Sequence, residues 1–279
     1  MSPSSTSAPV QAQPCTKLIN ADGTELAFYR WLNPEAKAEI LLVHGLGEHL
    51  GRYTALAEAL NQAGYQVSGV DFRGHGHSQG RRGHVSRWQQ YVSDLQTAAD
   101  AIAGPYLLVA HSMGTLVSLD FLRQPNQAQA VALSAPLLGV AVKAPAWKTA
   151  AAGLLSKLWP TLSLSNEIDA SEVCADPEVV ERYLADPLTF HTITPRWFTE
   201  MLAALERVTA HAALFELPIW TSYGDQDQIV SRQAVQDFLS AYGGEICFKG
   251  WPNGKHEIFN EAFQQQVFSH LITWLDTSV

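Results

Sequence analysis

Three polar residues have the types and the order that nucleophilic catalysis requires. Ser112, Asp227 and His256 each follow an apolar run of the kind that forms a buried strand. A serine hydroxyl is a poor nucleophile until a base removes its proton. The base in turn needs an acid that fixes its tautomer and stabilises the imidazolium. The three residues therefore predict acyl transfer through a covalent intermediate, a chemistry that needs no cofactor and no metal.

Ser112 lies in a stretch that reads as a strand, a tight turn and a helix. The apolar run 106–110 breaks at the serine, and a helix-like run, 115–122, follows. Ala110 and Gly114, two positions before and after the serine, are small, so strand and helix can approach closely, as a nucleophile elbow requires. The alternative is that Ser112 only caps the helix. The flanking elements favour the elbow.

Candidates for the acid and the base follow the last two expected strands. Asp225 and Asp227 both follow the strand at 218–223, and Asp225, directly after it, is expected to form the turn. We favour Asp227 as the acid. His256 is one of ten histidines, and a surface-loop role is the alternative. Its position after the strand at 245–248 makes it the best candidate for the base.

An acyl-transfer site also needs hydrogen-bond donors aimed at the developing oxyanion. The backbone N–H of Met113, which follows the nucleophile, is one expected donor. The second is assigned to Leu46, within the glycine-rich turn 44–47 that ends the apolar run 39–43. A plain glycine turn is the alternative.

The segment 71–78 contains an aspartate and two histidines that resemble a metal site. Asp71, His75 and His77 lie in a glycine-rich loop, but no further ligand follows at the spacing that a zinc site requires. We expect a structural turn without metal, in which Asp71 and Arg73 form a local charge-assisted pair.

Strands alternate with helices in the first half of the chain, after a hairpin at 17–32. This rhythm predicts a mostly parallel sheet with helices on both faces. The expected strands are 39–43, 65–70, 106–110 and 130–134, and the expected helices are 53–62 and 88–103.

The rhythm stops after Pro136 and resumes at Pro218. Only helical patterns occur between 137 and 216, and a segment of this length is better explained as an inserted subdomain than as a loop. The later elements are expected at 232–241 (helix), 245–248 (strand), 250–256 (loop) and 261–275 (helix). The predicted organisation is a disordered lead, 1–14, a core formed by 15–136 and 217–279, and an insertion, 137–216.

Composition excludes several classes of protein. With 18 basic and 27 acidic residues the net charge is −9, which argues against nucleic-acid binding. Three cysteines are too few and too scattered for a disulfide framework, so a reducing compartment, the cytoplasm, is expected. No apolar stretch approaches the ~20 residues of a membrane span, and the amino-terminal segment lacks the basic residues and apolar run of a secretory signal.

The start of the insertion is unusually apolar. We consider two explanations: packing of the insertion on the core, or an acyl tunnel or membrane-facing surface, because an apolar helix with few charges can rest at an interface. The residues concerned are Trp147, Leu154, Leu155, Leu158, Trp159, Leu162 and Leu164.

Together these motifs resemble the monoacylglycerol lipase and lysophospholipase-like serine hydrolases, a group filed with serine aminopeptidases of the α/β-hydrolase fold. The matching segments are HGLGEH (44–49), GRY (51–53), DFRGHGHS (71–78), HSMG (111–114), SAP (134–136), DPL (186–188), GDQDQIV (224–230) and HE (256–257). The resemblance runs from about Lys17 to the end. Ala110 and Thr115 depart from it, since glycines are usual at both positions.

The resemblance implies a Ser112–Asp227–His256 triad, in the chain order usual for this fold. It also implies an oxyanion hole of Leu46 and Met113, and an insertion that is a lid over an acyl pocket. We expect ester hydrolysis of a small-molecule substrate, with monoacylglycerols or lysophospholipids leading, and possible transient membrane or micelle contact through the lid.

Several alternatives share the scaffold, because a fold does not fix the substrate. A thioesterase and a carbon–carbon bond hydrolase remain open. An aminopeptidase would need carboxylates to hold the substrate amine, and Glu167, Asp169 and Glu172 could supply them. A non-catalytic binding scaffold is the alternative from another class, but it would be expected to have lost a member of the triad.

Overall fold

The structure is a computed structural model that describes residue 12 and residues 14–141 and 145–278. The predicted disordered lead, 1–14, therefore lies almost wholly outside the described residues. Of the two lead residues that are described, Ala12 is attached to the core: its N–H donates to Thr54 Oγ1 at 2.8 Å.

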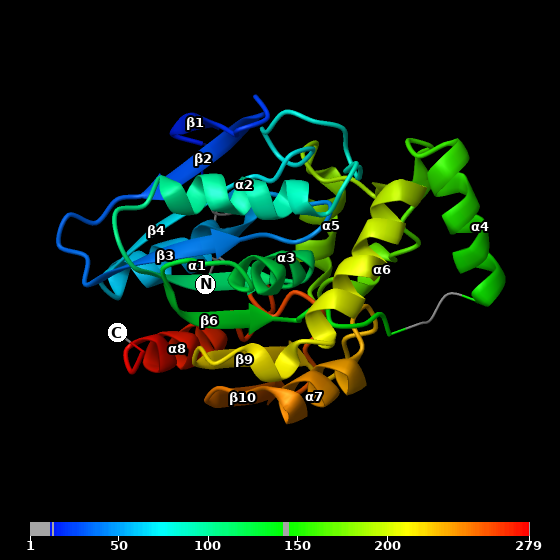
Figure 1. The fold of residues 1–279 in the computed structure, drawn as a ribbon. Coiled ribbons are helices and arrows are strands. Elements are labelled where there is room, and N and C mark those ends of the chain that lie inside the picture. Colours follow the sequence, from blue (N-terminus) through cyan, green and yellow to red (C-terminus); the bar gives the residue numbers. More distant parts are fainter. Residues whose placement is uncertain (1–11, 13, 142–144, 279) are drawn as a thin grey trace, which may run out of the picture.

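An eight-stranded sheet forms the centre of the molecule, with the strand order β1–β2–β4–β3–β5–β6–β9–β10 (Figure 1). The pairs β1–β2 and β2–β4 are antiparallel, and the remaining pairs are parallel. The predicted mostly parallel sheet is thus confirmed. The strands are β1 (Thr16–Ile19), β2 (Glu25–Trp31), β3 (Ala38–Val43), β4 (Tyr65–Val70), β5 (Tyr106–His111), β6 (Ala128–Ser134), β9 (Ile219–Gly224) and β10 (Ile246–Trp251).

Helices cover both faces of the sheet, which explains the uninterrupted apolar runs of its central strands. Every residue of β5 is buried. Its side chains alternate between two apolar clusters: Leu108 and Ala110 pack with the helices of one face, and Leu107 and Val109 with those of the other. The first face carries α2 (Gln89–Asp100), α3 (Met113–Leu122) and α7 (Arg232–Ala241), and the second carries α1 (Thr54–Gln62) and α8 (Gln264–Leu275).

The insertion lies at the edge where the parallel strands end, with α4 farthest from the sheet (Figure 1). Two short strands, β7 and β8, pair antiparallel within it, so the expectation of helices alone was wrong. Each strand has two residues, and their pairing partners are far apart in the chain, so no local pattern marks them. The elements are α4 (Ala146–Leu158), β7 (Leu164–Ser165), η2 (Ala170–Glu172), α5 (Pro177–Ala185), β8 (Thr192–Ile193), α6 (Pro195–Thr209) and η3 (Ala212–Leu214).

Two boundaries near the end of the chain also differ from expectation. β10 continues to Trp251, whereas the predicted strand stops at 248, because Lys249 and Gly250 interrupt the apolar run yet pair in register with β9. Helix α8 begins at Gln264 instead of 261. Glu261 lies before it, where its carboxylate accepts the N–H groups of Lys255 and Ala175.

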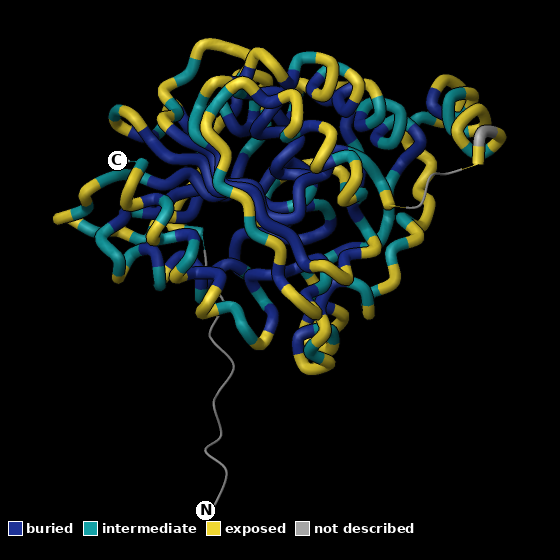
Figure 2. Tube along the Cα trace, turned by 90° about the horizontal axis from the view of Figure 1, so that it is seen from below, coloured by how far each residue is buried: buried dark blue, intermediate teal, exposed yellow. Residues whose placement is uncertain are grey.

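The earlier half of the insertion, with α4 and β7, and the later half, with α5, β8 and α6, attach differently to the rest of the molecule. The later half bonds directly to core loops: Phe190 N–H donates to Gly47 O and Thr194 N–H donates to Gly83 O, both at 3.0 Å. Helix α4 packs on α6, where Ser156 Oγ lies 2.9 Å from Thr199 Oγ1. In Figure 2 most of α4 is exposed, whereas the central strands β3, β4, β5, β6 and β9 are mostly buried.

Candidate active site

Ser112 occupies a strained turn between β5 and α3. Its φ of 49° and ψ of −121° lie in a region that L-residues rarely adopt. A Cβ added to Gly114 would come within 2.4 Å of the His44 carbonyl oxygen, so only glycine fits two residues after the serine. Thr115, which stands where related proteins usually have glycine, is well accommodated: its hydroxyl donates to Ser112 O at 2.6 Å and accepts from Leu137 N at 2.9 Å. The local geometry is that of a nucleophile elbow.

The structure brings Ser112, His256 and Asp227 into one hydrogen-bonded row. His256 Nε2 lies 2.8 Å from Ser112 Oγ, and His256 Nδ1 lies 2.8 Å from Asp227 Oδ2. Each residue is at the end of a different strand or in the loop after it. The three residues meet because β5, β9 and β10 are parallel and end at the same edge of the sheet. An imidazole held between a hydroxyl and a carboxylate can accept the hydroxyl proton while the carboxylate fixes its tautomer.

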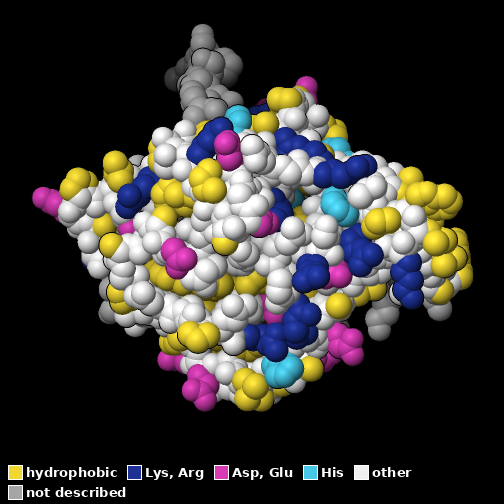
Figure 3. Space-filling view, turned by 45° about the horizontal axis from the view of Figure 1, so that its top comes forward, with side chains coloured by type: hydrophobic (Ala, Val, Ile, Leu, Met, Phe, Trp, Pro, Cys, Tyr) yellow, Lys and Arg dark blue, Asp and Glu magenta, His cyan; other side chains and the backbone are white. Residues whose placement is uncertain are grey.

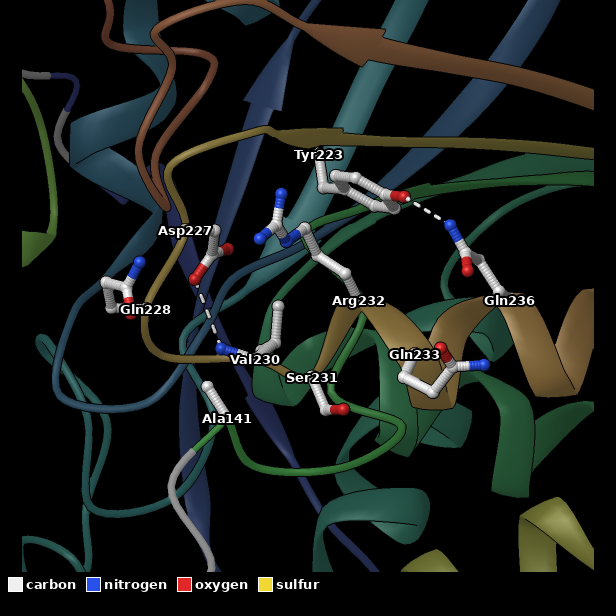
Figure 4. Close-up of a pocket in the computed structure, with 9 residues that line it drawn as sticks. All are labelled: Ala141, Tyr223, Asp227, Gln228, Val230, Ser231, Arg232, Gln233 and Gln236. Atoms are coloured by element: carbon white, nitrogen blue, oxygen red, sulfur yellow. Dashed lines mark hydrogen bonds between the residues drawn. The ribbon is translucent and has the colours of Figure 1, made fainter.

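The structure separates the two competing aspartates. Asp227 is buried, and its Oδ1 accepts from the N–H of Val230 at 3.1 Å (Figure 4) and from that of Ile229 at 2.8 Å. Its Oδ2 faces His256. Asp225 is exposed and accepts from Asn253 N at 2.7 Å, so it joins two loops instead of bonding its own turn.

The electrostatics of the row favour a charged Asp227 and a basic His256. Burial would raise the pKa of Asp227, but His256 and two backbone N–H groups lower it below its ordinary value. Burial would lower the pKa of His256, but the adjacent Asp227 carboxylate, with smaller contributions from Glu257 and Glu48, raises it. The ring of His111 packs against that of His256 at a tilt of 58°, with centroids 4.8 Å apart, and its pKa is lowered to about 4, first by burial and then by His256.

The glycine-rich turn 44–47 lies beside Ser112, as an oxyanion loop must. A Cβ added to Gly45 would lie 3.1 Å from Ser112 Cβ. Within the described part of the chain, neither Leu46 N–H nor Met113 N–H donates a hydrogen bond, so both are available to a ligand. His44 has a structural role in this turn: its Nε2 accepts from Phe72 N at 2.9 Å.

The segment 71–78 is a buried turn, and the expected pair of Asp71 with Arg73 is wrong. Asp71 instead accepts from Leu50 N at 2.8 Å, from Tyr29 OH at 3.0 Å and from His77 N at 2.9 Å. Arg73 forms its ion pairs with Asp94 and Asp22, both at 2.6 Å, from elements that the local sequence does not reveal. Among the residues with a described placement, no group of three or more His, Cys, Asp or Glu side chains could hold a metal ion.

Three charged residues of the sequence motifs lie next to the row, although residue type alone predicts no role for them. Arg52 lies between Glu48 and Glu257, and all three side chains are at least nine-tenths buried. Burial would raise the pKa of Glu48, but Arg52 and then His111 lower it to about 2. Charged letters within otherwise apolar or glycine-rich motifs were the signal that could have identified this cluster.

The structure has one cavity beside the row and another within the insertion. A polar cavity of about 450 Å³ adjoins Asp227 on the side of α7 and is lined by Tyr223, Arg232 and Gln236 among others (Figure 4). A second cavity, of about 410 Å³, lies between α4, the β7–β8 pair and α6. Its walls are mostly apolar and include Trp147, Leu155, Leu164, Ile193 and Phe198.

Comparison with known proteins places this site in a family. The chain is 34% identical to a monoglyceride lipase of Rattus norvegicus, with 98% of this chain and 94% of that protein covered. A crystal structure of a Paleococcus ferrophilus monoacylglycerol lipase matches with a TM-score of 0.86 and 29% identity, covering 91% of this chain and all of that one. An abhydrolase domain-containing protein of Dictyostelium discoideum is 28% identical over 93% of this chain, which spans only 28% of that protein's length.

The described residues contain no helix long and apolar enough to cross a membrane.

The family described as "Serine aminopeptidase, S33" matches residues 34–262, which span most of the chain and include the elbow, the insertion and the loops of Asp227 and His256. The chain therefore belongs to the serine aminopeptidase S33 family and is a serine hydrolase of the α/β-hydrolase fold.

Proposed function

We propose that the protein hydrolyses carboxylic esters through an acyl-enzyme on Ser112, with His256 as the base and Asp227 as the orienting acid. The observation that carries this proposal is the row of two 2.8 Å contacts from Ser112 Oγ to His256 and from His256 to Asp227. Nucleophile, base and orienting group within hydrogen-bond reach are the geometric requirement for this mechanism.

The reaction uses only groups of this chain, the ester and water. Ser112 Oγ attacks the ester carbonyl carbon as its proton passes to His256 Nε2, and the N–H groups of Leu46 and Met113 stabilise the oxyanion. Collapse of the intermediate breaks the bond to the alcohol, which leaves with the proton from His256. Water then attacks the acyl-serine with His256 as base again, and the acid and free Ser112 are released.

We infer that the substrate is a monoacylglycerol and that 137–216 is a lid on a core formed by 15–136 and 217–279. The monoglyceride lipase of Rattus norvegicus, similar over almost its whole length, supports this substrate. The mostly apolar cavity of about 410 Å³ beneath α4 supports an acyl-chain site, because ligand pockets are concave and lined mainly by hydrophobic side chains. A lysophospholipid carries the same acyl ester and is distinguished only by its head group.

Transient contact of the lid with a membrane or micelle is part of the proposal. Hydrophobic side chains gather over α4 at the right edge of Figure 3. Trp147 and Trp159 are 68% and 65% exposed, and Leu154 and Leu158 are 58% and 60% exposed. Apolar side chains on one exposed helix favour adsorption to a lipid surface.

The three cysteines are free, which supports a reducing cytoplasmic location.

An aminopeptidase is less well supported, although the family description uses that word. The three carboxylates considered for amine binding have other partners. Glu167 is 72% exposed and pairs with Lys148, Asp169 accepts from Ser171 N, and Glu172 lies 3.8 Å from Lys255 Nζ. Near the row, Glu48 and Glu257 both form ion pairs with Arg52.

The test is an assay of the purified protein against monoacylglycerols of several chain lengths, lysophosphatidylcholine, a p-nitrophenyl ester, an acyl thioester and an aminoacyl anilide. Ser112→Ala is the blank, and its loss of rate should be several orders of magnitude because a triad acts as a unit. Preferred cleavage of monoacylglycerols that the substitution abolishes supports the proposal. Preferred cleavage of lysophosphatidylcholine or the thioester would show that the substrate is not a monoacylglycerol. Turnover of the anilide alone would establish a peptidase.

The lid has its own test in the same assay. Trimming the apolar side chains of the insertion, with Trp147→Ala and Trp159→Ala, should change the preference for acyl length or the activity on micelles. An unchanged preference and unchanged micellar activity would contradict the lid.

A further inference from the structure

A single buried arginine joins the two loops that flank Ser112. Arg52 lies in η1 (Leu50–Tyr53), and its side chain is 7% exposed. Its guanidinium donates to Glu48 Oε2 at 2.8 Å and to both carboxylate oxygens of Glu257 at 2.6 and 2.7 Å. Glu48 follows the turn of Leu46, and Glu257 is the residue after His256. One side chain therefore connects segments about 200 positions apart.

The Glu48 carboxylate controls the path of the oxyanion loop. Its Oε1 accepts from Gly45 N and from Tyr53 OH, both at 2.6 Å. Gly45 precedes Leu46 and is the residue whose added Cβ would meet Ser112 Cβ at 3.1 Å. A shift of Glu48 would therefore move the backbone that must present the Leu46 N–H to the oxyanion.

The Glu257 carboxylate is fixed in the same way beside His256. Its Oε2 also accepts from Asn260 Nδ2 at 2.9 Å, and its own N–H donates to Val173 O at 2.7 Å. The ring of Tyr183 covers the guanidinium of Arg52, with 4.7 Å from the guanidinium carbon to the ring centroid. Burial and a two-point contact leave this pair little freedom.

We propose that Arg52 is a positioning residue of the hydrolytic reaction, which clamps the loop of Leu46 to the loop of His256 through Glu48 and Glu257. The proposal rests on the proposed function, because it assigns no reaction of its own. A lysine cannot replace the clamp, because its ammonium is a single charged point. The planar guanidinium donates from Nη1 and Nη2 to the two oxygens of Glu257, and Nη1 also donates to Glu48.

The clamp also balances charge around the base. Asp227, Glu257 and Glu48 each raise the pKa of His256, and the single positive charge of Arg52 opposes part of the effect of the last two. The titratable or charged groups around His256 are Ser112 and His111 from the β5 end, Asp227 from the β9 loop, Glu257 from its own loop, and Glu48, Arg52 and Tyr53 from the segment after β3. Removing the arginine charge should raise the pKa of His256, and removing the Glu257 charge should lower it.

The experiment measures kcat, KM and the pH dependence of kcat/KM with p-nitrophenyl acetate, a short ester that does not depend on the lid. Arg52→Lys should lower kcat roughly ten- to a hundredfold with KM nearly unchanged, since small displacements of catalytic groups have effects of this size. The acidic limb of the kcat/KM profile, where activity falls as His256 is protonated, should keep its midpoint in Arg52→Lys. The midpoint should move to lower pH in Glu257→Gln and to higher pH in Arg52→Gln. A general loss of packing would not produce opposite shifts.

Arg73→Lys is the matched control. Arg73 is 8% exposed and also pairs with two carboxylates, those of Asp94 and Asp22, but neither belongs to a loop of the site. Its replacement should lower the melting temperature and leave kcat and the acidic limb as in the parent protein. If Arg52→Gln does not fold, Arg52→Lys and Glu257→Gln still decide.

Two results would overturn the clamp: a folded Arg52→Lys protein with kcat within twofold of the parent, or an acidic limb that does not move to lower pH in Glu257→Gln. Failure of the proposed function is distinct from both. It would appear as the absence of any ester turnover by the parent protein that Ser112→Ala removes.

Discussion

The loops around Ser112 and the outer helix α4 are opposites in chemistry and in packing. Around Ser112, charged groups such as Glu48 and Asp227 are 3% exposed, and each has its hydrogen-bond partners. On α4 the side chains of Trp147, Leu154 and Leu158 are apolar and more than half exposed. A buried polar network with every group satisfied is rigid, whereas an exposed apolar helix with few core contacts can change its surroundings at little cost.

The contrast suggests a division of labour. Substitutions in the buried network should affect esters of every acyl length equally, because they change the chemical step. Substitutions on α4 should affect only long acyl chains or aggregated substrates. The later half of the insertion belongs mechanically with the core, since Phe190 and Thr194 bond to core glycines and Arg207 of α6 pairs with Asp120 of α3.

The largest expected effect separates Asp227 of the buried network from its exposed neighbour Asp225. Asp227→Asn should lower kcat on short and long esters alike by roughly 10³–10⁴-fold, because an amide does not hold His256 in the tautomer that accepts the serine proton. Asp225→Asn, two residues away and exposed, should leave kcat within about twofold, since surface changes are usually small. Equal losses in the two variants, measured in steady-state assays, would contradict the assignment of the acid.

The pH dependence of kcat/KM tests the same network. His256 must be neutral to accept a proton, and its pKa is raised above 6.5 by Asp227 despite burial. Activity should therefore fall about tenfold for each pH unit below a midpoint that lies above 6.5. His111, with a pKa near 4, is already neutral in this range and adds no second ionisation. The midpoint should be equal for short and long esters, and a steeper limb or a midpoint below 6 would be inconsistent with this account.

Two ion pairs of the insertion should contribute differently to the stability of the protein. One joins α6 to the core helix α3, and the other joins α4 to the segment after β7. Asp120 is fully buried and accepts from Arg207 and Arg123 at 2.6 and 2.8 Å, so Asp120→Asn should lower the free energy of unfolding by about 1–3 kcal/mol. The pair of Lys148 with Glu167 is exposed, and Glu167→Gln should cost no more than about 0.5 kcal/mol. Denaturant unfolding measures both, and equal costs would remove the mechanical distinction between the halves.

The smallest expected effect concerns the two tryptophans of α4 and its end. Trp147 lines the apolar cavity of about 410 Å³, so Trp147→Ala should reduce the preference for long over short acyl chains by roughly 10-fold, the lower end of what one methylene in a hydrophobic pocket contributes. Trp159 is 65% exposed and does not line that cavity among its described residues. Trp159→Ala should weaken binding to vesicles, measured by co-sedimentation, without changing the rate on a short dissolved ester.

Local patterns were sufficient for the fold because buried strands carry a strong signal. The β3 and β5 runs are apolar on both faces, and the sequence places them almost to the residue. The strand β10 was cut short because Lys249 and Gly250 resemble a loop, and only pairing with β9 extends the strand to Trp251. The β7–β8 pair, formed by Leu164 with Ile193, depends entirely on contact between distant segments.

The site shows the same limit. Residue type and chain order predict Ser112, Asp227 and His256, and the structure brings the three side chains together. The partners of the charged groups, in contrast, cannot be predicted from the local sequence. Arg73 was paired with the nearest aspartate, whereas its partner Asp94 lies on α2, 21 positions away. The contact of Arg52 with Glu257 spans 205 positions, and nothing in either local sequence specifies it.

The central claim is that hydrolysis passes through an acyl group on Ser112, and it can be tested by trapping that intermediate. A monoacylglycerol is mixed with the protein, the reaction is quenched in acid within milliseconds to seconds, and intact mass and peptide mapping locate any adduct. We predict a mass increase equal to the acyl group minus one hydrogen, carried by the peptide that contains Ser112 and absent from Ser112→Ala. Turnover by a Ser112→Ala protein, or an acyl group attached to another residue during turnover, would contradict the account.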